Sequence, residues 1–243
     1  MSRNPRRIEL SLGYILHHRP WRDTSRILEV FTREQGRATL FARGVRGPAA
    51  KLAPVLQPFR PLLLSFSGRG EAAHLSHAER AEDCGRLPPA HLMAAFYLNE
   101  LLLKLTTRHD PLPQLFDQYH ATLAQLRTEA PLAPALRVFE KRLLEILGYG
   151  LELESEAHTG VPLQARGYYH FRPSVGLTRA EATTAGALAG DSLIDLREEH
   201  WRGSRSLEDS RRLLQAALSA CLEGRPLATR EVARSMVRKA AQS

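Results

Sequence analysis

Residues 13–47 read GYILHHRPWRDTSRILEVFTREQGRATLFARGVRG, and this stretch decides the fold of the amino-terminal part of the chain. The runs 13–18, 26–31 and 37–42 are rich in aliphatic and aromatic residues, which is typical of short β-strands. Between the last two runs, Glu34-Gln35-Gly36 forms a tight turn, since glycine can take the positive φ of a three-residue hairpin loop. The stretch therefore predicts consecutive strands with glycine at a turn.

Similar runs extend the strand pattern on both sides of this stretch. Strands are expected over residues 8–11, 62–66 and 74–79, with a turn at 67–70 and a basic loop at 44–54. Five or six short strands within 80 residues favour a small closed or nearly closed barrel. The OB-fold is the commonest barrel of this size that carries positive charge, so we expect an OB-fold barrel over residues 1–80.

From Pro88 onward the apolar residues recur with helical spacing. Helices are expected over 89–107, 112–126, 132–147, 207–223 and 229–239. Residues 151–176 break the pattern and fit a short hairpin or an irregular insertion. Thr178-x-x-Glu181 and Ser206-x-x-Asp209 resemble helix capping boxes, so a further helix is expected to begin at Thr178. The fold class is α+β: a barrel, then a mainly α-helical domain over 81–243 with an irregular insertion at 151–176.

Positive charge is concentrated at the start of the chain. The 243 residues carry a net charge of +8, but residues 1–70 hold 13 Arg and Lys against 4 Asp and Glu. The remaining residues hold 21 basic against 22 acidic side chains, so the whole excess belongs to the predicted barrel. A localised positive field indicates a polyanionic partner.

Basic side chains with one aromatic residue gather around the second and third predicted strands and the loop after them. Such side chains neutralise phosphates, and an aromatic ring can stack on an unpaired base. A solubilising surface is the alternative, and Trp21 could equally be a core or lid residue. The candidate nucleic-acid-binding residues are Arg19, Trp21, Arg22, Arg26, Arg37, Arg43, Arg46 and Lys51.

Motifs for catalysis, cofactors and metals are missing from the sequence. It has no GxxxxGK[ST], GxSxG or HExxH pattern, and neither Cys84 nor Cys221 belongs to a CxxC pair. We therefore expect no enzyme activity, no cofactor and no bound metal. No run approaches the roughly 18 apolar residues of a membrane span, and no signal peptide is evident, so we expect a cytoplasmic protein.

Several segments together resemble one known family, the RecO recombination mediators. They fall in the order and spacing of that family over nearly the whole chain. The segments are 13–47, 57–71, 77–79, 98–101 (LNEL), 135–150 (ALRVFEKRLLEILGYG) and 224–231 (GRPLATRE). Some family members carry a four-cysteine zinc module after the GYG segment. This chain has no cysteine over 151–176, so it resembles the zinc-free branch.

The resemblance implies an OB-fold followed by a helical domain, and a nucleoid-associated role in DNA repair. It implies binding to single- and double-stranded DNA, annealing of complementary strands, and action on DNA coated by single-strand-binding protein (SSB). It further implies work with RecR and help in loading RecA, without a nucleotide cofactor. The alternative from another class is an OB-fold RNA-binding or translation-associated protein, which would share the basic barrel but not the helical motifs.

The resemblance also indicates a site for the acidic, apolar-tipped tail of SSB on the helical domain. Arg137 is the expected clamp for the terminal carboxylate, and Lys141, one turn further along the helix, adds positive charge. The neighbouring predicted helix would supply an apolar pocket wall. The expected wall residues are Phe116, Tyr119 and Leu123.

Overall fold

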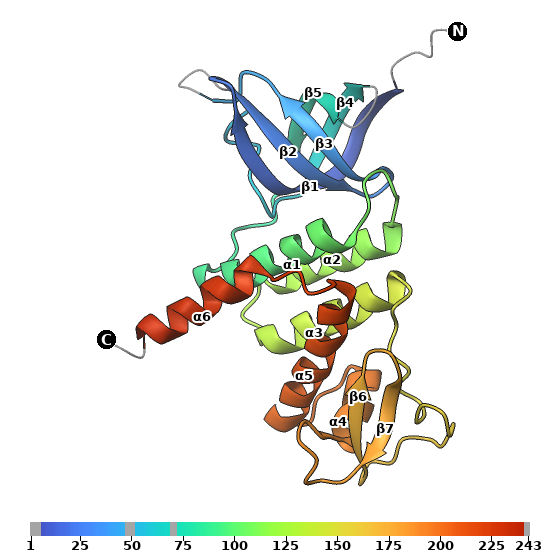
Figure 1. Ribbon diagram of the computed structural model, residues 1–243. Coiled ribbons are helices and arrows are strands. Elements are labelled where there is room, and N and C mark those ends of the chain that lie inside the picture. Colours follow the sequence, from blue (N-terminus) through green and yellow to red (C-terminus); the bar gives the residue numbers. More distant parts are fainter. Residues whose placement is uncertain (1–5, 47–51, 69–71, 241–243) are drawn as a thin grey trace, which may run out of the picture. The chain divides into compact units, whose positions relative to one another are not determined.

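The computed structural model describes residues 6–46, 52–68 and 72–240 (Figure 1). The chain forms two compact units. The first comprises residues 1–128 and 227–243, and the second comprises residues 129–226. This division groups residues 81–128 with the barrel, so it differs from the boundary expected at residue 80.

The first unit contains a closed five-stranded barrel with the strand order β1-β2-β3-β5-β4. All neighbouring strands are antiparallel except β3 and β5, which are parallel. This OB-like barrel followed by helices confirms the predicted α+β class. The strands are β1 (Arg6–Trp21), β2 (Ser25–Thr32), β3 (Gly36–Ala42), β4 (Leu62–Gly68) and β5 (Ala72–Arg80).

Every second side chain along a strand points inward, and these side chains fill the inside of the barrel. In β3 the buried positions Ala38, Leu40 and Ala42 alternate with half-buried ones, as a strand with one face on a core requires. Val45 and Leu56, from the segment between β3 and β4, are buried in the same core cluster. The loop predicted at 44–54 therefore contributes Val45 to the core, and its residues 47–51 lie outside the described part.

The strands expected separately at 8–11 and 13–18 form one long strand, β1, which pairs with both β2 and β4. Its pairing with β2 shifts between Ile15 and His17. The carbonyl of Leu16, at this bulge, accepts a hydrogen bond of 2.8 Å from the Asn99 side chain. A bulge leaves one residue unpaired in the ladder, and here a helix side chain satisfies it.

Helices α1 (Leu92–Leu105) and α2 (Pro113–Gln125), preceded by the short helix η1 (Pro89–His91), pack beside the barrel (Figure 1). Outward-facing Tyr14 and Phe31 contact the Phe116 ring at centroid distances of 5.7 and 5.6 Å. Tyr14 also lies edge-on to Tyr119 at 5.1 Å. This aromatic cluster explains why the barrel and the first two helices form one unit, because large rings contribute much of the energy of a core.

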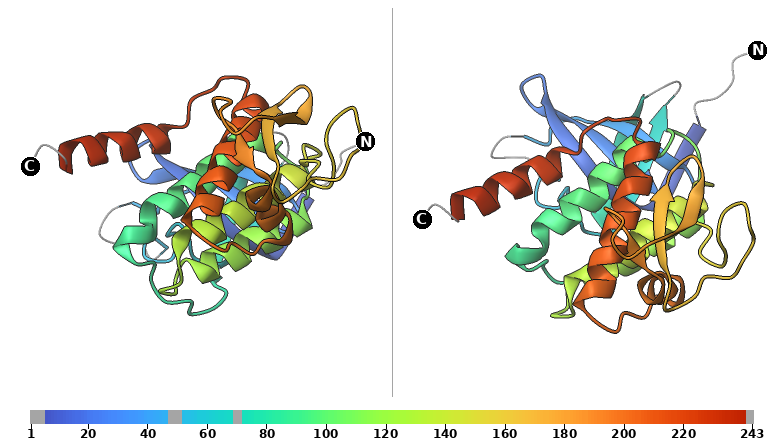
Figure 2. Two further views of the ribbon diagram at one scale, coloured as in Figure 1. Left: turned by 90° about the horizontal axis from the view of Figure 1, so that it is seen from below. Right: turned by 60° about the horizontal axis from the view of Figure 1, so that its bottom comes forward.

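Helix α6 (Ala228–Ala240) returns to the first unit and runs beside α1 (Figure 2). The Glu100 carboxylate of α1 accepts hydrogen bonds from the backbone N–H groups of Ala228 and Thr229 at 2.8 and 2.9 Å. It also accepts the Thr229 hydroxyl at 2.6 Å. Glu100 thus caps the start of α6 from a different helix.

The second unit combines a small sheet with helices. Its sheet has the order β7-β6-β8, and α5 packs against α3, α4 and β6 (Figure 2). The five helices expected at 89–107, 112–126, 132–147, 207–223 and 229–239 are all confirmed. The elements of this unit are α3 (Leu132–Ile146), β6 (Tyr168–Arg172), β7 (Gly176–Ala180), β8 (Leu188–Ala189), α4 (Gly190–Glu198) and α5 (Ser204–Cys221).

Both predicted capping boxes are wrong. Thr178 lies within β7 opposite His170, and the next helix, α4, begins at Gly190. Ser206 is buried inside α5, which begins two residues earlier. Asp209 is also internal to α5 and accepts the Ala189 N–H at 3.1 Å, so it ties the helix to β8 instead of capping it. Within the described residues, no helix is both long and apolar enough to cross a membrane.

Candidate nucleic-acid interface

One end of the barrel collects basic side chains from β1, β2 and the loop after β3. The strand register places Arg19 opposite Ile27, Pro20 opposite Arg26 and Trp21 opposite Ser25. Arg26 in turn lies opposite Ala42, the last residue of β3. The register therefore brings the end of β1, the start of β2 and the end of β3 into one region.

The loop after β3 is fixed to the β1–β2 turn. The N–H groups of Val45 and Arg46 both donate to the Thr24 carbonyl, at 2.9 and 3.0 Å. The Arg46 guanidinium donates to the Arg22 carbonyl at 3.1 Å, and Arg43 is exposed on the same loop. We call this set the rim cluster: Arg19, Trp21, Arg22, Arg26, Arg43 and Arg46.

An aromatic row lies on the outer face of the barrel beside the rim cluster. The Trp21 side chain is 42% exposed, and its ring lies 6.3 Å from that of Phe41. The Phe41 ring in turn lies 5.7 Å from that of His74 on β5. Sequence reasoning missed Phe41 and His74, although the alternation of β3 was sufficient to place Phe41 on the outer face.

Arginines of the rim cluster lack a carboxylate partner within the described ranges. In the described part of the chain, no ion pair involves Arg19, Arg22, Arg26, Arg43 or Arg46. Burial lowers the pKa of His18, which lies on β1, and the neighbouring Arg26 and His17 lower it further. A cluster of cations beside exposed rings can take up phosphates and stack on bases.

Arg37, another of the predicted nucleic-acid-binding residues, does not lie in the rim cluster. Its guanidinium forms an ion pair of 3.3 Å with Glu29 and donates to the Thr106 carbonyl at 2.8 Å. Only 14% of its side chain is exposed. Arg37 therefore ties the barrel to the end of α1 and has little surface to offer a phosphate. Lys51, the other remaining candidate, lies outside the described residues.

The predicted apolar wall of the peptide site is buried. Phe116, Tyr119 and Leu123 are each at most 1% exposed. The first two face Tyr14 and Phe31 of the barrel. The helical period correctly identified an apolar face, but the barrel covers that face. These three side chains offer no exposed pocket wall in this structure.

Arg137 and Lys141 lie on α3 in the second unit, and both are paired. The Arg137 guanidinium contacts the two Glu140 carboxylate oxygens at 2.7 and 2.8 Å, and the Arg137 side chain is 7% exposed. The Lys141 ammonium contacts Glu199 at 2.8 Å and Glu145 at 3.4 Å. Any carboxylate that binds Arg137 must compete with Glu140.

A metal ion would need several close ligands of the right kind. Over the described residues, no group of three His, Cys, Asp or Glu side chains lies close enough to hold a metal ion. Burial raises the pKa of the Cys221 thiol, which is partly buried on α5.

Comparisons with known proteins cover both parts of the chain. The family "Recombination protein O N terminal" matches residues 9–84, and "Recombination protein O C terminal" matches residues 89–230. A "DNA repair protein RecO" of Methylococcus capsulatus is 42% identical over 232 residues, which cover 96% of each chain. A protein of the same name from Pseudomonas paraeruginosa is 39% identical over 90% of this chain and 92% of its own.

A third relative of that name, from Cupriavidus pinatubonensis, is 37% identical over 95% of this chain and 80% of its own. The matched families account for the barrel and for the helices and small sheet that follow it. Identity at this level over nearly the full length, together with both family matches, shows that the chain belongs to the RecO family of DNA repair proteins.

Proposed function

We propose that the protein binds single- and double-stranded DNA through the rim cluster and anneals complementary strands, without acting as an enzyme. The observation that carries the proposal is a set of mostly exposed arginines that form no ion pair among the described residues and lie beside the aromatic row of Trp21, Phe41 and His74. Membership in a DNA repair family identifies DNA as the polyanion to test first.

Annealing follows from electrostatics and requires no bond-making chemistry. Two strands repel each other through their phosphates, and a cationic surface that holds both screens this repulsion and raises their local concentration. Base pairing then drives the reaction. Stacking on Trp21 and Phe41 is tolerant of sequence because every base has a π face, so we expect little sequence preference.

Further parts of the proposal come from the family resemblance. We propose that the protein acts in the cytoplasm, at the nucleoid, on DNA coated by SSB. We also propose that it engages RecR and helps to load RecA. An RNA-binding role is the alternative, because a basic rim with aromatic rings would also accept RNA. A protein that anneals DNA strands in preference to binding RNA would support the DNA role.

A charge-removal variant tests the rim cluster. We expect Arg22→Ala/Arg43→Ala/Arg46→Ala to weaken binding of all DNA sequences alike and to slow annealing. Each lost phosphate contact removes about 0.7 from the log–log salt slope on a single strand, so the slope should fall by about 2. The matched control, Arg166→Ala/Arg172→Ala/Arg225→Ala, removes three arginines of the second unit. Equal losses in the two variants would refute the rim assignment.

We retain Arg137 as the proposed clamp for the SSB tail, without the apolar wall first expected. Its internal partner provides a test, because Glu140→Gln removes the competing carboxylate. A tail peptide should then bind more tightly to Glu140→Gln and about ten- to a hundredfold more weakly to Arg137→Ala, the effect of one charge-assisted contact. Unchanged peptide affinity in both variants would leave Arg137 with a purely structural role.

A further inference from the structure

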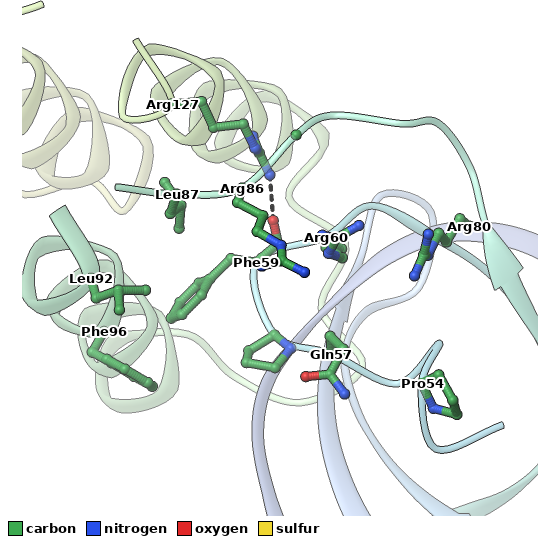
Figure 3. A pocket seen from close by; sticks show the side chains of 12 residues that line it. Pro54, Gln57, Phe59, Arg60, Arg80, Arg86, Leu87, Leu92, Phe96 and Arg127 are labelled. Carbon is green, nitrogen blue, oxygen red and sulfur yellow. Dashed lines mark hydrogen bonds between the residues drawn. The ribbon is translucent and has the colours of Figure 1, made fainter. Parts of the chain in front are cut away.

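A pocket of about 570 Å³ lies within the first unit (Figure 3). Its walls come from the segment 54–60, the end of β5, the linker to α1, α1 itself and the end of α2. Four arginines line it, and no acidic residue does. These arginines are Arg60, Arg80, Arg86 and Arg127.

Three of the four guanidinium groups have no partner among the described residues. In that part of the chain, no side-chain hydrogen bond or ion pair is formed by Arg60, Arg80 or Arg86. Arg127 is the exception, because its guanidinium donates to the Phe59 carbonyl. Like charges held together without counter-ions repel one another, and a bound anion would relieve that repulsion.

The other wall of the pocket is apolar and aromatic. Figure 3 shows Leu87, Leu92 and Phe96 grouped on the side away from Arg60 and Arg80. The Phe96 ring is 44% exposed and stands edge-on to Phe59 at 4.9 Å. A flat ring can therefore lie against Phe96 while its charged substituent reaches the arginines.

The backbone at the pocket is held in a strained conformation. Phe59 has a φ of +64°, in the left-handed region that bulky residues avoid. Its ring is buried against Phe96, and Arg127 holds its carbonyl. Strain that the surroundings maintain in this way is concentrated at binding sites, and here it shapes the floor of the pocket.

We propose that this pocket holds one nucleotide unit of single-stranded DNA, with its base against Phe96 and its phosphate among Arg60, Arg80 and Arg86. The Gln57 amide, also in the lining, can donate to or accept from a base edge. The pocket is then a second point of contact on a strand that the rim cluster also binds. This inference rests on the proposed function.

Chemistry favours a nucleotide over an acidic peptide. The terminal carboxylate of a peptide needs only one or two cations. A DNA strand presents phosphates that alternate with flat bases, and three arginines beside an exposed phenyl ring match that pattern. Pockets of a few hundred Å³ commonly enclose a ligand of nucleotide size.

The test compares two double variants in binding to an oligo(dT) of about thirty nucleotides, longer than the 4–16 that one OB-fold covers. Arg80→Ala/Arg86→Ala should lower the salt slope by about 1.4, as two lost phosphate contacts require. Arg166→Ala/Arg172→Ala removes the same charge from the second unit and should leave the slope unchanged. Phe96→Leu should weaken binding about fivefold without changing the slope, because it removes stacking and no charge.

Photo-crosslinking of a bromodeoxyuridine strand gives an independent readout in the wild-type protein. Crosslinks on the peptide that contains Phe96 are expected. The inference is overturned if crosslinks are confined to Trp21 and Phe41 and the pocket variant binds DNA like its control. It is also overturned if the pocket variant loses an acidic peptide but no DNA. If the rim variant alone loses DNA, the proposed function stands without the pocket, and if neither variant loses DNA, both fail.

Discussion

Gly36 connects the β2–β3 turn to the loop between α1 and α2. Its φ is +68°, and a Cβ built on it would lie 2.1 Å from the carbonyl oxygen of Asp110. Nearby, the His109 N–H donates to the Arg37 carbonyl at 2.8 Å. The residue is therefore constrained by its conformation and by the close approach of a second chain segment.

We predict that Gly36→Ala lowers the free energy of unfolding by more than about 2 kcal/mol, because strain and a backbone clash add. Chemical denaturation measures the loss. Gly44→Ala is the matched control: its φ is +63°, but nothing lies within 4 Å of a Cβ there. That variant should lose only about 1 kcal/mol for the backbone strain. A loss at position 36 no larger than at position 44 would show that the approach of Asp110 is easily relaxed.

The sequence allowed the turn at Gly36 to be predicted because its cause is local. It did not allow the role of Arg37 to be predicted, because the partners of Arg37 are Glu29 on the neighbouring strand and the Thr106 carbonyl at the end of α1. A basic residue that binds phosphate and one that ties two elements together look the same in sequence. Only the tertiary contacts separate Arg37 from Arg22 and Arg43.

Helix α6 depends on the carboxylate of Glu100. Burial alone would raise the pKa of Glu100. The hydrogen bonds from Thr229, Lys104 and Ala228 outweigh that effect and lower the pKa from 4.5 to about 2. A carboxyl whose folded pKa is depressed stabilises the fold above its unfolded pKa, and this stabilisation is lost as the pH falls toward the folded pKa.

We predict that the attachment of α6 weakens as the pH falls from about 5 to about 2, and that Glu100→Gln weakens it at neutral pH and removes this pH dependence. The loss in the variant should be about 1.5–3 kcal/mol at neutral pH, the value of hydrogen bonds to a charged group. Hydrogen exchange at the amides of Ala228 and Thr229 reports the change. Glu231→Gln, an exposed position in the first turn of the same helix, is the control, and equal effects of the two variants would contradict the capping role.

Helices were more predictable than the motifs thought to start them. An apolar period extends over a whole helix, so α1, α2, α3, α5 and α6 could all be located from sequence. A four-residue capping pattern contains much less information. Thr178 satisfied the pattern but pairs with His170 in a hairpin, whose turn at 173–176 is the stronger local signal.

The candidate site, too, was predictable only where its signal is visible in the sequence. The rim arginines and Trp21 could be predicted because charge segregation is visible in sequence. The arginine pocket could not, because its lining comes from five segments between residues 54 and 127 that only the fold brings together. Phe116 and Tyr119 were assigned to a surface because a helix's apolar face does not reveal what covers it.

The two units of the protein differ in net charge. The first unit, residues 1–128 and 227–243, contains 22 Arg and Lys against 12 Asp and Glu. The second, residues 129–226, contains 12 against 14. In the second unit, moreover, many arginines are already paired, including Arg137, Arg197 and Arg212. The net positive field of the protein therefore originates in the first unit.

We predict that hydrogen exchange mapped with an oligo(dT) will show protection in the first unit, at the end of β1, at the start of β2 and over residues 43–46, with no change in the second. The reason is that an exposed cation without an internal partner gains a phosphate at little desolvation cost, whereas a paired one must first give up its carboxylate. At about 1 M salt the Debye length is about 3 Å, so the protection should disappear there. A strand with an uncharged backbone serves as the control at low salt. Protection over α3 or α5 instead would mean that DNA displaces the internal ion pairs of the second unit. The DNA surface could then no longer be assigned from the arginines that lack an ion pair.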